Sequence, residues 1–182
     1  MLLTTFAPWR AHQPSNSADD LVAHLQRNLL LPPNAVVMRH LPVSFELAPI
    51  RVVAKLVELR PSVVVCCGMA EGRSHLHLER YGRMGELTLE TTLPLEKLIA
   101  VTHLTGISDC AGNYVCNHLY YRLLEAIARH RWPTQAVFVH IPPLTPATQP
   151  LLARDLALIL KQLSQPTQLL DSRLVDGSPK AN

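Results

Sequence analysis

The sequence is poor in cysteine and in charge, and each shortage argues against a class of protein. With 4 cysteines in 182 residues, the chain is too large and too cysteine-poor to depend on a secreted disulfide framework. Charged residues make up 17%, and the formal net charge is only +3. A nucleic-acid partner is not expected, because the small basic surplus is spread along the chain and forms no patch.

Long hydrophobic runs are also missing. No apolar run approaches the roughly 20 residues that a membrane helix needs, so no membrane partner is predicted. The first residues, Met1-Leu-Leu-Thr-Thr-Phe6, lack the basic region that opens a signal peptide. The expected location is therefore the cytoplasm, where the four thiols stay free.

What the chain does have is enough apolar material for one core. Hydrophobic residues make up 48%, and the length is that of a single ordinary domain. We expect that domain to span residues 1–166. Polar and breaker residues dominate the end of the chain, which predicts a flexible tail over residues 167–182.

Segments typical of strands and helices alternate along the domain. Strands are predicted over residues 1–6, 35–41, 63–67, 105–109 and 135–141, with a hairpin of 74–81 and 86–92 through Gly82 and Gly85. Helices are predicted from a cap at Ser17 or Asp19 to about Leu30, and over 48–60, 94–103, 113–130 and 147–163. This order favours a three-layer α/β/α sandwich with a mostly parallel central sheet and an antiparallel hairpin extension.

Sites in such sheets lie beyond the carboxyl ends of the strands. That rule places the strand ends near Phe6, Gly68, Cys110 and His140 on one rim. Cys116 follows close by, at the opening of the strongest helical segment. With Asn113 as its N-cap, Cys116 would lie in the first turn, where the helix dipole and free N–H groups stabilise a thiolate and can hold an oxyanion. The alternative is a small buried apolar side chain.

Two further residues could assist a thiol. His140 ends the strand before Ile141-Pro-Pro143, a good place for a general base, although a polar residue at a strand end needs no function. Strand alternation places His75, His77 and Glu79 on one face. That face is either solvated, or offers Glu79 to orient His140, or forms a His-x-His-x-Glu metal site that lacks an identifiable fourth ligand.

In order along the chain, seven stretches resemble pyroglutamyl peptidase type I, the cysteine peptidase family that removes N-terminal pyroglutamate. They are residues 2–8, 41–46, 60–68, 72–73, 78–80, 111–118 and 137–143. Each of Cys116, His140 and Glu79 falls in its own family context, which makes the ordered set specific.

The resemblance implies a catalytic triad, with Cys116 as nucleophile, His140 as general base and Glu79 as the acidic member. It implies a pyroglutamate pocket that includes Phe6, Trp9, Met69 and Tyr114, with Met69 standing where many bacterial members carry glutamine. The family needs no metal or cofactor and acts on small peptides with a blocked N-terminus. Its members are often oligomeric, so a homo-oligomer is expected.

The chain also departs from the family pattern. Trp9-Arg10-Ala11 replaces the usual Phe-Gly-Gly turn, and residues 80–115 form a connection of only 36 residues between Glu79 and Cys116. Family members have a longer connection that helps to cover the pocket. Two alternatives therefore stay open: a hydrolase of the same fold with a different small acyl or amide substrate, and a catalytically weak protein that binds a ligand or partner.

Overall fold

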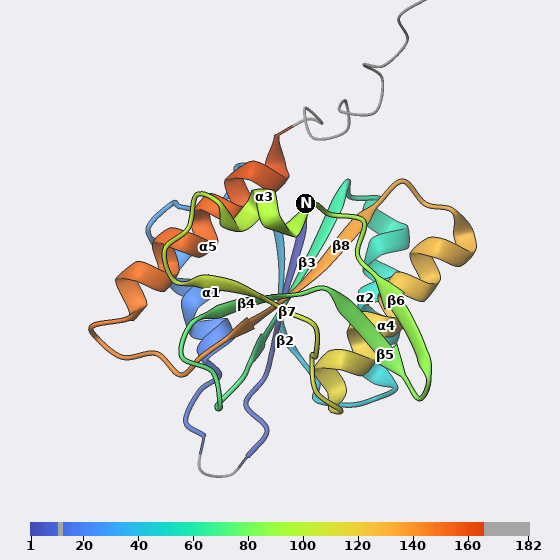
Figure 1. Ribbon diagram of the computed structural model, residues 1–182, viewed down its shortest axis with the longest axis horizontal. Coiled ribbons are helices and arrows are strands. Elements are labelled where there is room, and N and C mark those ends of the chain that lie inside the picture. The colour runs from blue at the N-terminus through green and yellow to red at the C-terminus, as the bar shows by residue number, and fades with distance from the viewer. Residues whose placement is uncertain (11–12, 166–182) are drawn as a thin grey trace, which may run out of the picture.

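A central sheet of six strands organises the chain. The computed structural model describes residues 1–10 and 13–165 (Figure 1). In spatial order the strands are β2 (Val36–Leu41), β1 (Leu2–Phe6), β3 (Val63–Met69), β8 (Gln135–Ile141), β4 (Leu76–Glu79) and β7 (Thr105–Ser108). The first four run parallel, whereas β4 pairs antiparallel with β8 and parallel with β7.

Helices cover both faces of the sheet (Figure 1). On one face lie α1 (Ser17–Arg27), α3 (Leu95–Ile99) and α5 (Gln149–Ser164). On the other lie α2 (Leu47–Leu59), α4 (Val115–His130) and a separate hairpin of β5 (Tyr81–Met84) and β6 (Leu87–Glu90). The predicted three-layer α/β/α sandwich is confirmed.

The middle strand β3 shows why the core has two halves. Val63, Val65 and Cys67 pack toward α1 and α5, whereas Val64 and Cys66 pack toward α2 and α4. Successive side chains of a strand point to opposite faces, so a β-branched run that is apolar on both faces needs a layer on each side.

The predicted antiparallel hairpin is present, and residues 86–92 contain its second strand, but residues 74–81 are not its first strand. Residues 76–79 form β4 inside the central sheet, because Leu76 and Leu78 are fully buried in the core shared with α5. The actual hairpin is β5 with β6, which turns at Gly85 with a φ of 58°. A positive φ of this kind is cheap for glycine and strained for other residues.

Both predicted helix caps are also wrong. Asn16 caps α1, with its side chain accepting a hydrogen bond from the Ala18 N–H at 3.0 Å. Tyr114 occupies the N-cap position of α4 in place of Asn113, since its backbone is extended and its carbonyl accepts from the His118 N–H at 3.1 Å. Cys116 is still in the first turn.

The predicted common rim holds for β1, β3 and β8, but not for β7. Because β7 runs with β4 and against β8, its end at Ser108 lies level with Glu79 and Phe138, partway along β8. Within residues 1–10 and 13–165, no helix is long and apolar enough to cross a membrane. The tail predicted for residues 167–182 lies outside the described residues.

Candidate active site

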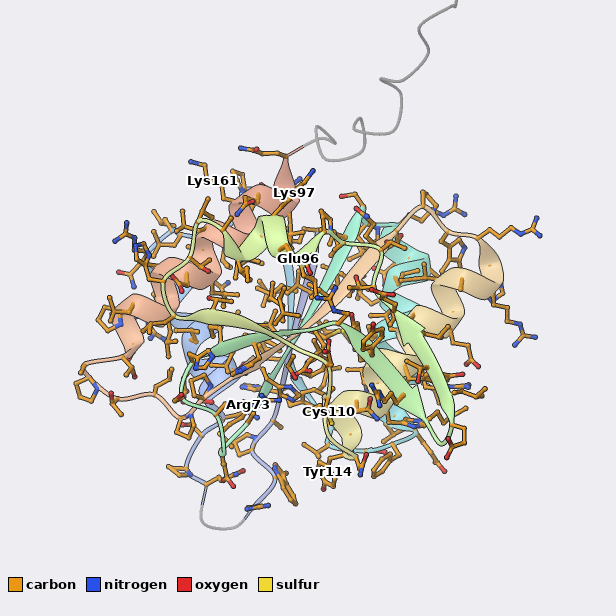
Figure 2. The ribbon with its side chains drawn as sticks, in the orientation of Figure 1. Arg73, Glu96, Lys97, Cys110, Tyr114 and Lys161 are labelled. Atoms are coloured by element: carbon orange, nitrogen blue, oxygen red, sulfur yellow. The ribbon has the colours of Figure 1, made fainter. Side chains whose placement is uncertain are left out.

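A cavity of about 370 Å³ opens where β1, β3 and β8 end. Six of the seven residues predicted for the site line it: Phe6, Trp9, Met69, Tyr114, Cys116 and His140. Glu79 lies behind His140, away from the lining. In Figure 2, Tyr114, Cys110 and Arg73 lie toward the end of the molecule that carries this site, and Glu96, Lys97 and Lys161 lie toward the opposite end.

The thiol of Cys116 sits where α4 meets β3. Cys116 is the second residue of α4. A Cβ atom at Gly68 would lie 2.8 Å from the Cys116 Sγ and 2.8 Å from the Phe138 Cζ. Glycine at the end of β3 therefore makes room for the thiol, which a larger residue would displace.

The expectation of a resting thiolate is not supported. Burial raises the pKa of the Cys116 thiol to about 12, and the neighbouring Cys66 and Glu79 add to the rise. A hydrogen bond from its own backbone N–H opposes this rise without overcoming it. Desolvation thus outweighs the helix N-terminus. The thiol keeps its proton at rest and needs a base that accepts the proton during attack.

His140 and Glu79 form a buried pair beside that thiol. In the β4–β8 register, His77 lies opposite His140 and Glu79 lies opposite Phe138, so all four side chains share one face. The Glu79 Oε1 is 2.7 Å from the His140 Nδ1. Glu79 is fully buried and His140 is 6% exposed, so the alternative of a solvated face is wrong for Glu79.

Arg73 extends this pair into a cluster. Its Nη2 lies 3.7 Å from the Glu79 Oε1, and donates to the Ser108 Oγ at 2.9 Å and to the Cys110 carbonyl at 3.1 Å. Sequence reasoning placed Arg73 in a family motif without giving it a role. Its contacts join segments distant in the sequence, and no local pattern could reveal them.

His75 and His77 do not form a metal site with Glu79. Their ring centroids are 4.2 Å apart and the ring planes are tilted by 34°, and the Nδ1 of His77 lies 3.1 Å from the His75 carbonyl oxygen. Burial lowers the pKa of His77, and the charge of Arg73 lowers it further. Among the described residues, no group of three or more histidine, cysteine or acidic side chains is placed to hold a metal ion.

Sequence reasoning missed the polar wall of the cavity. Arg10, Gln13 and Glu71 line it together with Asn16 and Val43. Arg10 forms an ion pair with Glu71 at 2.9 Å, and the Gln13 amide donates to Glu71 at 2.8 Å. These contacts tie the loop after β1 to the loop after β3. The sequence signal that could have revealed this wall is the presence of Arg10 and Glu71 in segments whose composition is otherwise typical of loops.

The site combines a thiol at the first turn of a helix, an imidazole at the end of a strand and a buried carboxylate behind that imidazole. This combination is typical of a cysteine hydrolase on an α/β scaffold. The family model for pyroglutamyl peptidase matches residues 1–84 and 83–150. The chain belongs to this family of cysteine peptidases.

Relatives agree with that assignment, and solved structures share the fold. The chain is 30% identical to pyrrolidone-carboxylate peptidase 1 of Ralstonia nicotianae, across 85% of this chain and 86% of the relative. The pyrrolidone-carboxylate peptidase of Pseudomonas fluorescens is 28% identical over 79% and 78%. The fold matches pyroglutamyl peptidase I of Bacillus amyloliquefaciens with a TM-score of 0.75 at 22% identity, over 89% of this chain and 93% of that one.

The family match is divided between Glu79 and Cys116. Its two segments meet at residues 83–84, which end strand β5 just before the turn of the hairpin. A match divided at this point is what a shorter connection between Glu79 and Cys116 would produce. The β5–β6 hairpin occupies that place.

Proposed function

We propose that the protein is a cysteine omega-peptidase that removes N-terminal pyroglutamate from small peptides, with Cys116, His140 and Glu79 as its catalytic triad. The observation that carries the proposal is the 2.7 Å contact of His140 with buried Glu79, at a cavity shared by His140 and Cys116, in a chain of this family.

The chemistry is acyl transfer in two steps. The Cys116 sulfur attacks the carbonyl carbon of the pyroglutamyl residue while the free nitrogen of His140, Nε2, accepts the thiol proton. The imidazolium then protonates the leaving amine as the C–N bond breaks, which leaves a thioester on Cys116. Water, deprotonated by His140, hydrolyses the thioester and releases pyroglutamate and the free thiol.

Glu79 serves this cycle through His140. Its carboxylate accepts from Nδ1, which leaves Nε2 as the basic nitrogen, and it stabilises the imidazolium that forms during attack. Free N–H groups in the first turn of α4, with backbone N–H groups near Gly68, are the proposed donors to the oxyanion. Phe6, Trp9, Met69 and Tyr114 are the proposed walls for the pyroglutamyl ring.

The first test is hydrolysis of a fluorogenic pyroglutamyl amide by the purified protein, with Cys116→Ser and Glu79→Gln beside it. We expect turnover that is abolished in Cys116→Ser and lowered about 10²-fold or more in Glu79→Gln, whose amide can no longer stabilise the imidazolium. Circular dichroism should show both variants folded. Turnover that survives in Cys116→Ser would contradict the assignment of the nucleophile.

The second candidate function is hydrolysis of a different small acyl or amide substrate by the same three residues. The charged wall of Arg10 and Glu71 in the cavity favours it. A panel of N-acyl amides separates the two, because only this candidate predicts a substrate that is cleaved faster than the pyroglutamyl amide in a Cys116-dependent way. A protein that binds such ligands without cleaving any would be the catalytically weak binder.

Three smaller expectations stay predictions. They are a cytoplasmic location, a homo-oligomer, and a single domain over residues 1–166.

A further inference from the structure

The exposed aromatic side chains of this protein gather at one place. The chain has 3 phenylalanines, 4 tyrosines and 2 tryptophans, all within the described residues. Only Trp9, Phe45 and Tyr114 are exposed, at 44%, 47% and 42%. Scattered single apolar residues on a surface need no explanation, whereas clustered aromatic residues mark binding surfaces.

These three rings lie in a row, and each contacts the next. The ring centroids of Trp9 and Tyr114 are 4.9 Å apart, and those of Tyr114 and Phe45 are 5.8 Å apart. The ring of His118 continues the row, 5.4 Å from Phe45. We call Trp9, Tyr114, Phe45 and His118 the aromatic strip.

The strip begins at the catalytic cavity and leads away from it. Trp9 and Tyr114 line that cavity, whereas Phe45 and His118 do not. A second hollow of about 500 Å³ shares Tyr114 with the cavity and is lined by Phe45 and His118. A third, of about 670 Å³ between α2 and α4, shares Phe45 and His118 with the second. The three hollows are thus linked through the residues of the strip.

The start of the strip is held in place before any ligand arrives. The Arg10 guanidinium lies 4.5 Å from the centre of the Trp9 ring, and Arg10 is fixed by its ion pair with Glu71 at 2.9 Å. Trp9 therefore has Arg10 and Tyr114 as neighbours, an arrangement that limits the side-chain entropy lost on binding.

We propose that Phe45 and His118, the part of the aromatic strip outside the catalytic cavity, bind the residues that follow pyroglutamate, and that they favour peptides of four or more residues with aromatic or other apolar side chains there. The inference rests on the proposed function, because the scissile bond must lie at Cys116 and the rest of the peptide must leave through the cavity mouth. The distance from Trp9 to Phe45 along the strip corresponds to about three extended residues, at roughly 3.5 Å each.

The test compares three substrates: pyroglutamyl-glycine, an all-alanine pyroglutamyl tetrapeptide, and the same tetrapeptide with phenylalanine at its second and third positions. We expect kcat/KM to be roughly 5- to 10-fold higher for the phenylalanine peptide than for the alanine peptide, as aromatic contacts of this kind allow. Phe45→Ser should bring that ratio close to one and leave pyroglutamyl-glycine turnover unchanged. Phe45→Tyr should preserve the ratio.

A matched control is Val57→Ser, which removes an apolar side chain of similar exposure (50%) from α2, away from the strip. It should keep the wild-type ratio. Equal kcat/KM for the two tetrapeptides, or a ratio unchanged by Phe45→Ser, would overturn the proposal. So would a Phe45→Ser variant that changes only the sedimentation mass, because the strip would then be a contact between copies of this chain.

A binding measurement separates this inference from the proposed function. Calorimetry of the phenylalanine tetrapeptide with Cys116→Ser, and with Cys116→Ser combined with Phe45→Ser, needs no turnover. Tighter binding by the first variant supports the strip even if the wild-type protein cleaves no pyroglutamyl peptide. If the two variants bind the tetrapeptide equally and the wild-type protein cleaves pyroglutamyl-glycine, the proposed role of the aromatic strip is refuted and the proposed function is retained.

Discussion

At the scale of single residues, the site contains a buried carboxylate with few partners. Glu79 is fully buried, and its Oε2 has no hydrogen-bond partner among the described residues. An unpaired buried charge is costly. Apart from His140, the cation within 4 Å of this carboxylate is Arg73, whose Nη2 lies 3.7 Å away. Arg73 is therefore the permanent positive charge beside this carboxylate.

This arrangement predicts that Arg73 supports turnover. Arg73→Met removes the cation beside Glu79 and the hydrogen bonds to Ser108 and Cys110, so the carboxylate loses a partner that holds it behind His140. We expect kcat/KM for a pyroglutamyl amide to fall about 10-fold, as the loss of a charge-assisted contact allows.

Arg73→Lys is the control, because it keeps the charge and loses the planar fork that reaches Ser108 and Cys110. It should retain more of the turnover than Arg73→Met does. Equal losses in the two variants would show that the hydrogen bonds of Arg73, and not its charge, support the site.

At the scale of elements, the short connection between Glu79 and Cys116 is docked on the helix that carries the thiol. A Cβ atom at Gly82 would lie 2.7 Å from the backbone of Tyr121, so β5 packs directly against α4. The side chain of Asn117 accepts from the Arg83 N–H and donates to the Arg83 carbonyl, both at 2.8 Å. This buried amide fixes the hairpin next to Cys116.

Asn117→Ala should therefore loosen the hairpin. It removes both hydrogen bonds and leaves the Arg83 backbone groups without these partners, which should lower the free energy of unfolding by roughly 1–3 kcal/mol. Urea denaturation measures that loss, and hydrogen exchange should show faster exchange over residues 81–90. Asn113→Ala, at an exposed position in the loop before α4, should change stability by no more than about 0.5 kcal/mol. Equal stability of the two variants would refute the role of Asn117.

At the scale of the whole molecule, buried acidic residues join layers that the hydrophobic core alone does not align. Asp155 on α5 accepts hydrogen bonds from the backbone N–H groups of His103 and Leu104 and from the Thr105 hydroxyl, which fixes the start of β7. Asp19 on α1 accepts from Thr5 on β1 at 2.6 Å and from Arg39 on β2 at 2.8 and 2.6 Å. These contacts set the position of each helix along its strands.

Asp19 makes stability depend on acid. Burial alone would raise the pKa of this carboxyl, but hydrogen bonds from Arg39, Thr5 and His40 outweigh burial and lower it. A lowered folded-state pKa gives stability that is complete above the unfolded value of about 3.9 and is lost as pH falls below it. Urea unfolding should show a falling free energy between about pH 4 and pH 2.

Asp19→Asn should be less stable than the wild type near neutral pH, by roughly 2–3 kcal/mol, and should lose less stability between those two pH values. Asp20→Asn, its neighbour on α1, is the matched control and should follow the wild-type pH dependence. If the pH dependence of Asp19→Asn equals that of the wild type, other carboxyls are responsible for acid sensitivity.

The sequence by itself determined the elements and the identity of the chemistry. Alternation of apolar residues predicted the strands and helices, since each element must bury one face or both, and the family motifs pointed to Cys116, His140 and Glu79. It did not predict that residues 76–79 join the central sheet, because the neighbours that bury Leu76 and Leu78 are distant in the chain.

Only the tertiary structure decided the pKa of the Cys116 thiol and which residues surround the catalytic site. A helix N-terminus alone favours a thiolate, but packing against β3 desolvates Cys116 and raises its pKa to about 12. Contacts between residues tens of positions apart place Arg73 beside Glu79, dock the hairpin on α4 and bring the rings of the aromatic strip together. Local periodicity reports which face of an element is apolar, whereas charge, desolvation and cavity shape depend on what the fold places against that face.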